Sequence, residues 1–154
     1  MRIVKKILLG LLGVFIIIQF IQPARNKSED ISPTDLTRTF NVPQHVQSLL
    51  QSSCYDCHSN NTKYPWYSKI QPIGWILANH IRKGKAELNF SDFSSYSKRR
   101  QISKMNGIAN SVKDGSMPLS SYLVLHKEAG LSKDEKALLI DWAIKTKDSL
   151  RSNN

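Results

Sequence analysis

The sequence predicts an all-α protein, with one small helical domain behind a separate apolar segment at the N-terminus. Apolar residues recur at three- and four-residue steps after about residue 43, and no run alternates as a strand would. Residues that start and stop helices stand at the ends of these segments. With 154 residues, the chain has room for one domain of ordinary size.

Residues 1–24 are predicted to be a membrane anchor or a signal sequence. A short basic start, residues 1–6, precedes an almost wholly apolar run over residues 7–21, which is typical of both. The run is shorter than the roughly 20 residues of a full span, but no clear small-residue cleavage site follows it. We therefore expect an uncleaved anchor in the cytoplasmic membrane, with the domain on the periplasmic side; a cleaved signal and a buried helix remain alternatives.

Residues 25–42, rich in Ser, Thr, Asp, Asn and Pro, are expected to form a linker, and residues 43–150 the helical domain. Helices are predicted from residue 43 toward residue 54, over 71–83, over 97–113 and from 132 onward. Gly84 and the pair Asp114-Gly115 are expected to end the second and third, and Ser132-Lys133-Asp134-Glu135 is a capping box that starts the last.

Two of these helices show a clear face that should be buried. In the third helix it consists of Ile102, Met105, Ile108, Ala109 and Val112, and in the last helix of Leu138, Leu139, Trp142 and Ala143.

The only two cysteines stand in Cys54-Tyr55-Asp56-Cys57-His58. This C-x-x-C-H spacing is the attachment pattern of a c-type haem. Two thiols at this spacing can add to the two vinyl groups of the porphyrin, and the next residue places an imidazole under the iron. We expect one covalent haem c on Cys54 and Cys57 with His58 on the iron, the other imidazole nitrogen donating to a backbone carbonyl.

Three other uses of the cysteine pair are weighed against haem attachment. A thioredoxin-like redox disulfide would need a βαβ pattern, which is missing around the pair. A zinc site would have to recruit His58 together with His80 or His126 at irregular spacing. A structural disulfide would close too small a loop to stabilise the fold much.

Met117 is predicted to be the sixth ligand of the iron. It stands before Pro118, which disfavours helix at the preceding residue and so places Met117 in a loop. A soft thioether from such a loop can bind the iron and raise its reduction potential; the alternative is a gap-filling apolar contact. Met105, on an apolar helix face, is expected in the core instead.

The remaining histidines and aromatic residues are given lesser roles. His80 and His126 are expected near the haem or at the surface, and His45 is expected to be exposed. Aromatic side chains after the cysteines are expected to wall the haem: Tyr64, Trp66, Tyr67 and Trp75. Arg82 and Lys63 are weak candidates for binding a haem propionate.

Several stretches together resemble one known family. They are Cys54–His58, Asn79–Gly84, Leu88–Ser91, Met117-Pro118, Tyr122, His126, Glu128-Ala129 and Leu131-Ser132. The chain from about residue 42 to 145 resembles the small haem-binding domain family of bacterial, mostly Bacteroidetes-type, proteins, which is cytochrome c-like. The resemblance implies a small helical domain wrapped around one haem, usually behind an N-terminal membrane helix.

These expectations combine into a membrane-tethered monohaem c-type cytochrome that transfers electrons by Fe(II)/Fe(III) cycling and is not an enzyme. The formal net charge of +10 favours acidic redox partner proteins, and no motif for nucleic acid is present. The alternatives are a haem-based gas sensor or peroxidase-like enzyme, if Met117 leaves the iron open, and a membrane-anchored dithiol–disulfide protein without haem.

Overall fold

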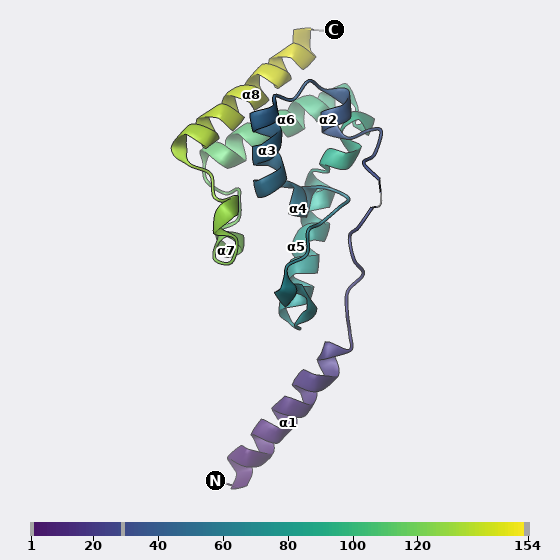
Figure 1. Cartoon of the computed structure of the whole chain (residues 1–154), viewed down its shortest axis with the longest axis vertical. Helices are drawn as coiled ribbons and strands as arrows, with labels where there is room; N and C mark the ends of the chain where they lie inside the picture. Colours follow the sequence, from purple (N-terminus) through teal and green to yellow (C-terminus); the bar gives the residue numbers. More distant parts are fainter. Residues whose placement is uncertain (1, 29, 153–154) are drawn as a thin grey trace.

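The computed structural model describes residues 2–28 and 30–152, and this part of the chain contains helices and loops but no strand. Figure 1 shows the long helix α1 (Arg2–Gln19) standing apart from all the others, joined to them by an extended segment. The other helices gather into one body, with the C-terminal helix at the end farthest from α1. The predicted all-α class is confirmed.

The body contains seven α-helices and three short 3₁₀ turns among the described residues. The α-helices are α2 (Leu36–Thr39), α3 (Gln44–Ser53), α4 (Tyr55–His58), α5 (Ile73–Glu87), α6 (Lys98–Lys113), α7 (Ser120–Leu123) and α8 (Lys133–Ser152). The 3₁₀ turns are η1 (Trp66–Lys69), η2 (Phe90–Ser95) and η3 (Lys127–Ala129). The long helices α6 and α8 lie side by side, with α3 against them (Figure 1).

The core lies between α3, α6, α8 and η2, and the predicted helix faces supply most of it. Its fully buried members include Leu50, Phe90, Phe93, Met105, Leu139 and Ala143. The expectation that Met105 packs in the core is thus confirmed. Leu138 is wrongly predicted as buried, because the adjacent Leu139 occupies the core-facing position and Leu138 is turned outward, 37% exposed.

The predicted ends of α6 and α8 are confirmed by their capping contacts. Gly115 follows α6 with a φ of 76°, a left-handed conformation that glycine adopts without the steric cost of a side chain. At the start of α8, the Ser132 backbone N–H donates to Glu135 Oε2 at 2.8 Å, and the Glu135 N–H donates to Ser132 Oγ at 3.3 Å. This is the reciprocal pair of a capping box.

Helix α5 runs one turn beyond the predicted end at Gly84, to Glu87. Glycine is present there because α5 passes very close to α4, not because the helix stops. A Cβ built on Gly84 would lie 2.7 Å from the backbone oxygen of Cys57. Tertiary packing has therefore overruled the helix-ending tendency of this residue.

Replacing Gly84 by alanine should destabilise the protein, although alanine is the better helix former. The new methyl group would meet backbone atoms, which cannot move aside as a flexible side chain can, so we expect a loss of about 1–3 kcal/mol in the free energy of unfolding. Chemical denaturation of the haem-loaded protein measures it. The matched control is Gly10→Ala in α1, where the added Cβ meets nothing within 4 Å. Equal denaturation midpoints for the two variants would contradict the close approach of α5 to the Cys57 backbone.

The segment predicted as a linker, 25–42, contains helix α2. Asp35 caps this short helix by accepting the Thr37 N–H at 2.9 Å, and Leu36 is fully buried in the core. Part of the segment is thus packed against the helical body, which a polar composition without periodicity does not indicate.

The predicted N-terminal membrane anchor is wrong, and so are the cytoplasmic-membrane location and the periplasmic orientation that depended on it. None of the helices in the described ranges combines the length and the apolar composition that crossing a bilayer requires. Helix α1 has 18 residues, about 27 Å of helix, and its first turns carry Arg2, Lys5 and Lys6, which leaves an apolar stretch shorter than a bilayer core.

Helix α1 is connected to the body by polar contacts at its C-terminal end. Gln19 Nε2 donates to the backbone oxygen of Gln71 at 3.1 Å, and the Gln71 N–H donates to Gln19 Oε1 at 2.9 Å. The Trp75 indole N–H donates to the backbone oxygen of Ile21 at 2.8 Å. No described side chain of α1 is buried.

Candidate functional site

The two cysteines lie where the chain turns from α3 into α4. Cys54 closes α3, with its N–H bonded to the Leu50 carbonyl, and its φ of −129° interrupts the helical path before α4 begins. The N–H groups of Cys57 and His58 then both donate to the carbonyl of Cys54, at 3.2 and 3.0 Å. Residues three and four apart on such a turn share one face, so the two thiols and the imidazole are held together.

The ring of His58 is held by a backbone carbonyl, as the sequence analysis predicted. Its Nδ1 lies 3.0 Å from the oxygen of Leu88, the residue that closes α5. Because a carbonyl oxygen can only accept, Nδ1 carries the proton of this hydrogen bond, and in the neutral imidazole Nε2 then has the lone pair. Phe90 packs edge-on to the ring, with 6.3 Å between the ring centres. The ring orientation and its tautomer are therefore fixed.

Two neighbouring cavities, of about 130 and 410 Å³, lie beside this turn. Both are lined by Ser53, Cys54, His58, Glu87 and Met117, so they adjoin, and together they are called the hollow. The smaller part reaches Leu88, Phe90, Ile108 and Val112, and the larger part reaches Cys57, His80, Lys83, Pro118 and Tyr122. Both parts have largely apolar walls; Lys104 borders the smaller part, and His80 and Lys83 border the larger part.

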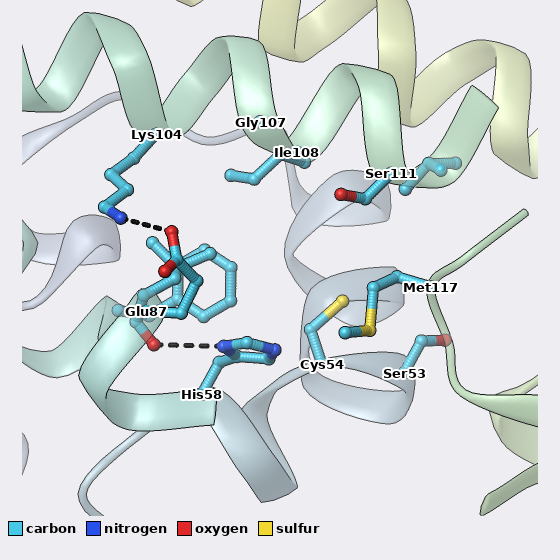
Figure 2. Close-up of a pocket in the computed structure, with 12 residues that line it drawn as sticks. Ser53, Cys54, His58, Glu87, Lys104, Gly107, Ile108, Ser111 and Met117 are labelled. Carbon is cyan, nitrogen blue, oxygen red and sulfur yellow. Dashed lines mark hydrogen bonds and ion pairs between the residues drawn. The ribbon is translucent and has the colours of Figure 1, made fainter. Parts of the chain in front are cut away.

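Met117 lies in the loop between α6 and α7, as predicted, and borders both parts of the hollow. In Figure 2, its thioether and the ring of His58 extend into the hollow from opposite sides, with the Cys54 thiol between them. The Met117 N–H donates to the carbonyl of Ser111 at 3.0 Å, which attaches the loop to the end of α6.

A second contact joins the Met117 loop to the cysteine turn. The hydroxyl of Tyr122, on α7, donates to Asp56 Oδ2 at 2.8 Å, and the Lys63 N–H donates to Asp56 Oδ1 at 3.0 Å. Burial and the hydrogen bond to Asp56 raise the pKa of Tyr122, so its hydroxyl remains a donor. The loop that carries Met117 is thus attached at one end to α6 and at the other to the cysteine turn.

The two cysteines are half-buried and border the larger part of the hollow. Burial, followed by the proximity of Cys57, raises the pKa of the Cys54 thiol to about 12. Burial, followed by the charge of Asp56, raises the pKa of Cys57 to about 11. Because the thiolate is the nucleophile in disulfide exchange, both cysteines are poor reagents for that chemistry at neutral pH.

The structure separates the two histidines that were given lesser roles. His80 borders the larger part of the hollow, near Met117 and Cys57. His126 does not border it: its Nε2 lies 2.6 Å from the hydroxyl of Tyr67 and its Nδ1 lies 3.1 Å from Glu128 Oε1. His45 is exposed, as expected.

None of the four aromatic residues that were predicted to wall the haem borders the hollow. Trp66 is 77% exposed, and Trp75 bonds to the segment after α1. Tyr67 belongs to a small buried cluster against which Cys57 packs. Tyr64 and the predicted propionate partner Arg82 line a different cavity.

Sequence reasoning missed several residues that do line the hollow. Phe90 and Tyr122 are the aromatic residues there, and Glu87 forms an ion pair of 2.6 Å with Lys104, which also lines the hollow (Figure 2). Ile108 and Val112 had been identified only as a buried helix face. Glu87 could have been found from the sequence, because it directly precedes Leu88–Ser91, one of the stretches that carry the family resemblance.

The residues present fit a haem better than the other candidates. An imidazole with a free Nε2 and a thioether face one hollow with apolar walls, next to two thiols. This is the donor set of Met/His haem ligation. By contrast, no three His, Cys, Asp or Glu residues within the described ranges gather as a zinc site requires.

Comparison with known proteins agrees with this geometry. The model of the haem-binding domain family matches residues 13–145, which is most of the chain and includes every residue of the hollow. No curated protein and no solved structure matches the chain. The resemblance inferred from the sequence is confirmed: the chain belongs to the haem-binding domain family.

Proposed function

We propose that this haem-binding protein is a monohaem c-type cytochrome and acts as an electron carrier. Cys54 and Cys57 would hold the haem through two thioethers, and His58 and Met117 would be the axial ligands of its iron. The observation that carries the proposal is the placement of the C-x-x-C-H turn and Met117 on opposite sides of one hollow. The bound haem supplies a one-electron Fe(II)/Fe(III) couple.

The protein's own groups would tune that couple. Donation from His58 Nδ1 to the Leu88 carbonyl increases the basicity of Nε2 and keeps the ring in place. A thioether from Met117 favours the reduced iron and so raises the potential. The apolar walls contributed by Phe90 and Val112 disfavour net charge at the site and act in the same direction.

The other two functions considered from the sequence have less support. A haem enzyme or gas sensor requires an open coordination position, whereas Met117 borders the hollow in a loop fixed at both ends. A dithiol–disulfide protein requires a reactive thiolate, whereas burial raises the pKa of both cysteines.

The direct test is to express the chain with a cytochrome c maturation system and to separate it on a denaturing gel stained for haem. Haem that remains on the denatured chain, together with no free thiol at either cysteine, is the expected result. A weak ferric absorption band near the red end of the spectrum, which reports iron–sulfur ligation, is expected from the native protein. A colourless protein with free or mutually bridged thiols would refute the proposal.

The redox partners are proposed to be acidic, because the chain has 22 Lys and Arg against 12 Asp and Glu. The reduced protein should therefore transfer electrons to ferricyanide, an anionic acceptor, more slowly as salt is added. Between roughly 0.01 and 1 M salt the Debye length falls from about 30 to about 3 Å, and we expect the rate to fall by about tenfold or more.

Stopped-flow absorption measures this rate. The control is a cationic acceptor of the cobalt(III) ammine type, whose reaction should accelerate with salt, since screening then removes a repulsion. Equal rates at all salt concentrations for both acceptors would contradict electrostatic steering.

A further inference from the structure

A second cavity, separate from the hollow at the cysteines, lies on another side of α5. It has a volume of about 300 Å³, and none of its lining residues borders the hollow. Its walls come from the extended segment after α1, from Tyr64 and from α5. Three of its lining residues are cations: Arg25, Arg82 and Lys85.

No carboxylate among the described residues forms an ion pair with these three cations. Arg82 and Lys85 stand three residues apart on α5, so their charges are neighbours and repel each other. The chain brings Arg25 to the same place from a distant part of the sequence. A gathering of three like charges is unfavourable unless an anion balances them.

The cations are held in place by neutral partners. Arg25 lies over the ring of Tyr64, 4.4 Å from its centre, and donates to Ser68 Oγ at 2.8 Å. Lys85 donates to Asn26 Oδ1 at 2.6 Å, and Arg82 donates to Asn79 Oδ1 at 2.8 Å. Each cation keeps further N–H groups that these partners do not use.

The segment that carries Arg25 is itself anchored at the next residue. Asn26 Nδ2 donates to the Ser59 carbonyl and to Thr62 Oγ1, both at 2.8 Å, and the Thr62 N–H donates to the Asn26 carbonyl at 2.9 Å. The Asn26 N–H donates to the hydroxyl of Tyr64 at 2.8 Å. The chain segment that forms this wall of the cavity is therefore fixed without a ligand, while the Arg25 and Arg82 side chains are exposed to solvent.

We propose that this cavity binds a phosphate group. Two guanidinium groups and one ammonium match the charge and the several acceptor oxygens of a phosphate dianion, which each guanidinium can contact with two parallel N–H donors. The Tyr64 hydroxyl oxygen accepts from the Asn26 N–H, so its own O–H is available to donate to the same ligand. The phosphate can come from the free anion or from a small phosphate ester. The site does not depend on the haem.

Isothermal titration calorimetry of the haem-loaded full chain tests the proposal with inorganic phosphate and glycerol 3-phosphate in parallel, at low salt. One site per chain is expected for the better ligand, and the tighter of the two identifies the source of the phosphate group. Arg82→Gln and Lys85→Gln should each weaken binding by roughly tenfold, because each removes one charge-assisted contact.

The matched control is Arg99→Gln, which removes one exposed cation from α6, outside the cavity, and should leave the affinity unchanged. A second check is Tyr64→Phe, which removes only the hydroxyl and should give a smaller loss than Arg82→Gln. Failure of wild-type protein to bind either ligand, or an equal loss in Arg99→Gln and Arg82→Gln, would overturn the proposal.

Discussion

Replacing both cysteines by alanine should leave no haem on the denatured chain. Cys54 and Cys57 are the two positions where a thioether can form, so the double variant Cys54→Ala, Cys57→Ala loses every covalent link to a haem. Any haem that the variant still binds through His58 and Met117 should separate from the chain in detergent. A denaturing gel stained for haem measures this, with protein staining as the loading reference.

Ser53→Ala is the matched control for the cysteine variant. Ser53 borders the same hollow next to Cys54 but has no thiol, so its replacement should leave the haem stain unchanged. A stain that persists in the double variant would show that attachment occurs elsewhere or that the stain reports trapped haem. Either result would contradict the assignment of Cys54 and Cys57.

Replacing Met117 by leucine should keep the haem attached but lower its reduction potential. Leucine is close to methionine in volume and lacks the sulfur, so the change isolates the thioether. Loss of an axial ligand that favours reduced iron should lower the potential on the order of 0.1 V or more, within the roughly 0.8 V range that axial ligands span. A spectroelectrochemical titration measures this shift, and the ferric band near the red end should vanish.

The same substitution at Met105 provides the control. Met105 is fully buried in the core and does not border the hollow, so Met105→Leu should cost less than about 1.5 kcal/mol of stability and leave the potential unchanged. A wild-type potential in Met117→Leu would remove Met117 from the iron. His80, which also borders the hollow, would then be the next residue to test.

The parts of the site that sequence alone could predict depend on local chemistry. The spacing of Cys54, Cys57 and His58 is set by one helical turn, and the loop position of Met117 follows from the proline after it. The capping box at Ser132 and the helix-ending glycine at 115 are likewise interactions within a few residues. Each of these needs no knowledge of where distant segments lie.

The parts that could not be predicted depend on contacts between distant segments. Gly84 was predicted to end a helix, but it is a glycine because α4 packs closely against it. Leu36 was predicted to lie in a linker, but it packs in the core. The aromatic residues nearest in sequence to the cysteines were expected to wall the haem, but Phe90 and Tyr122 border the hollow instead. Sequence proximity was a poor guide because the loop after α4 packs against the segment after α1, where Asn26 contacts Thr62 and Tyr64.

In the proposed cytochrome, the carbonyl of Leu88 would give helix α5 an influence on the iron without any direct contact between α5 and the iron. Leu88 caps the end of α5, because its N–H donates to the Gly84 carbonyl at 2.8 Å, and its own carbonyl accepts the proton of His58 Nδ1. The electron density at the imidazole thus depends on the position of α5. The same helix lies close to the Cys57 backbone at Gly84. A small tilt of α5 would alter the electron-donating strength of the ligand while leaving every atom of the coordination sphere chemically the same.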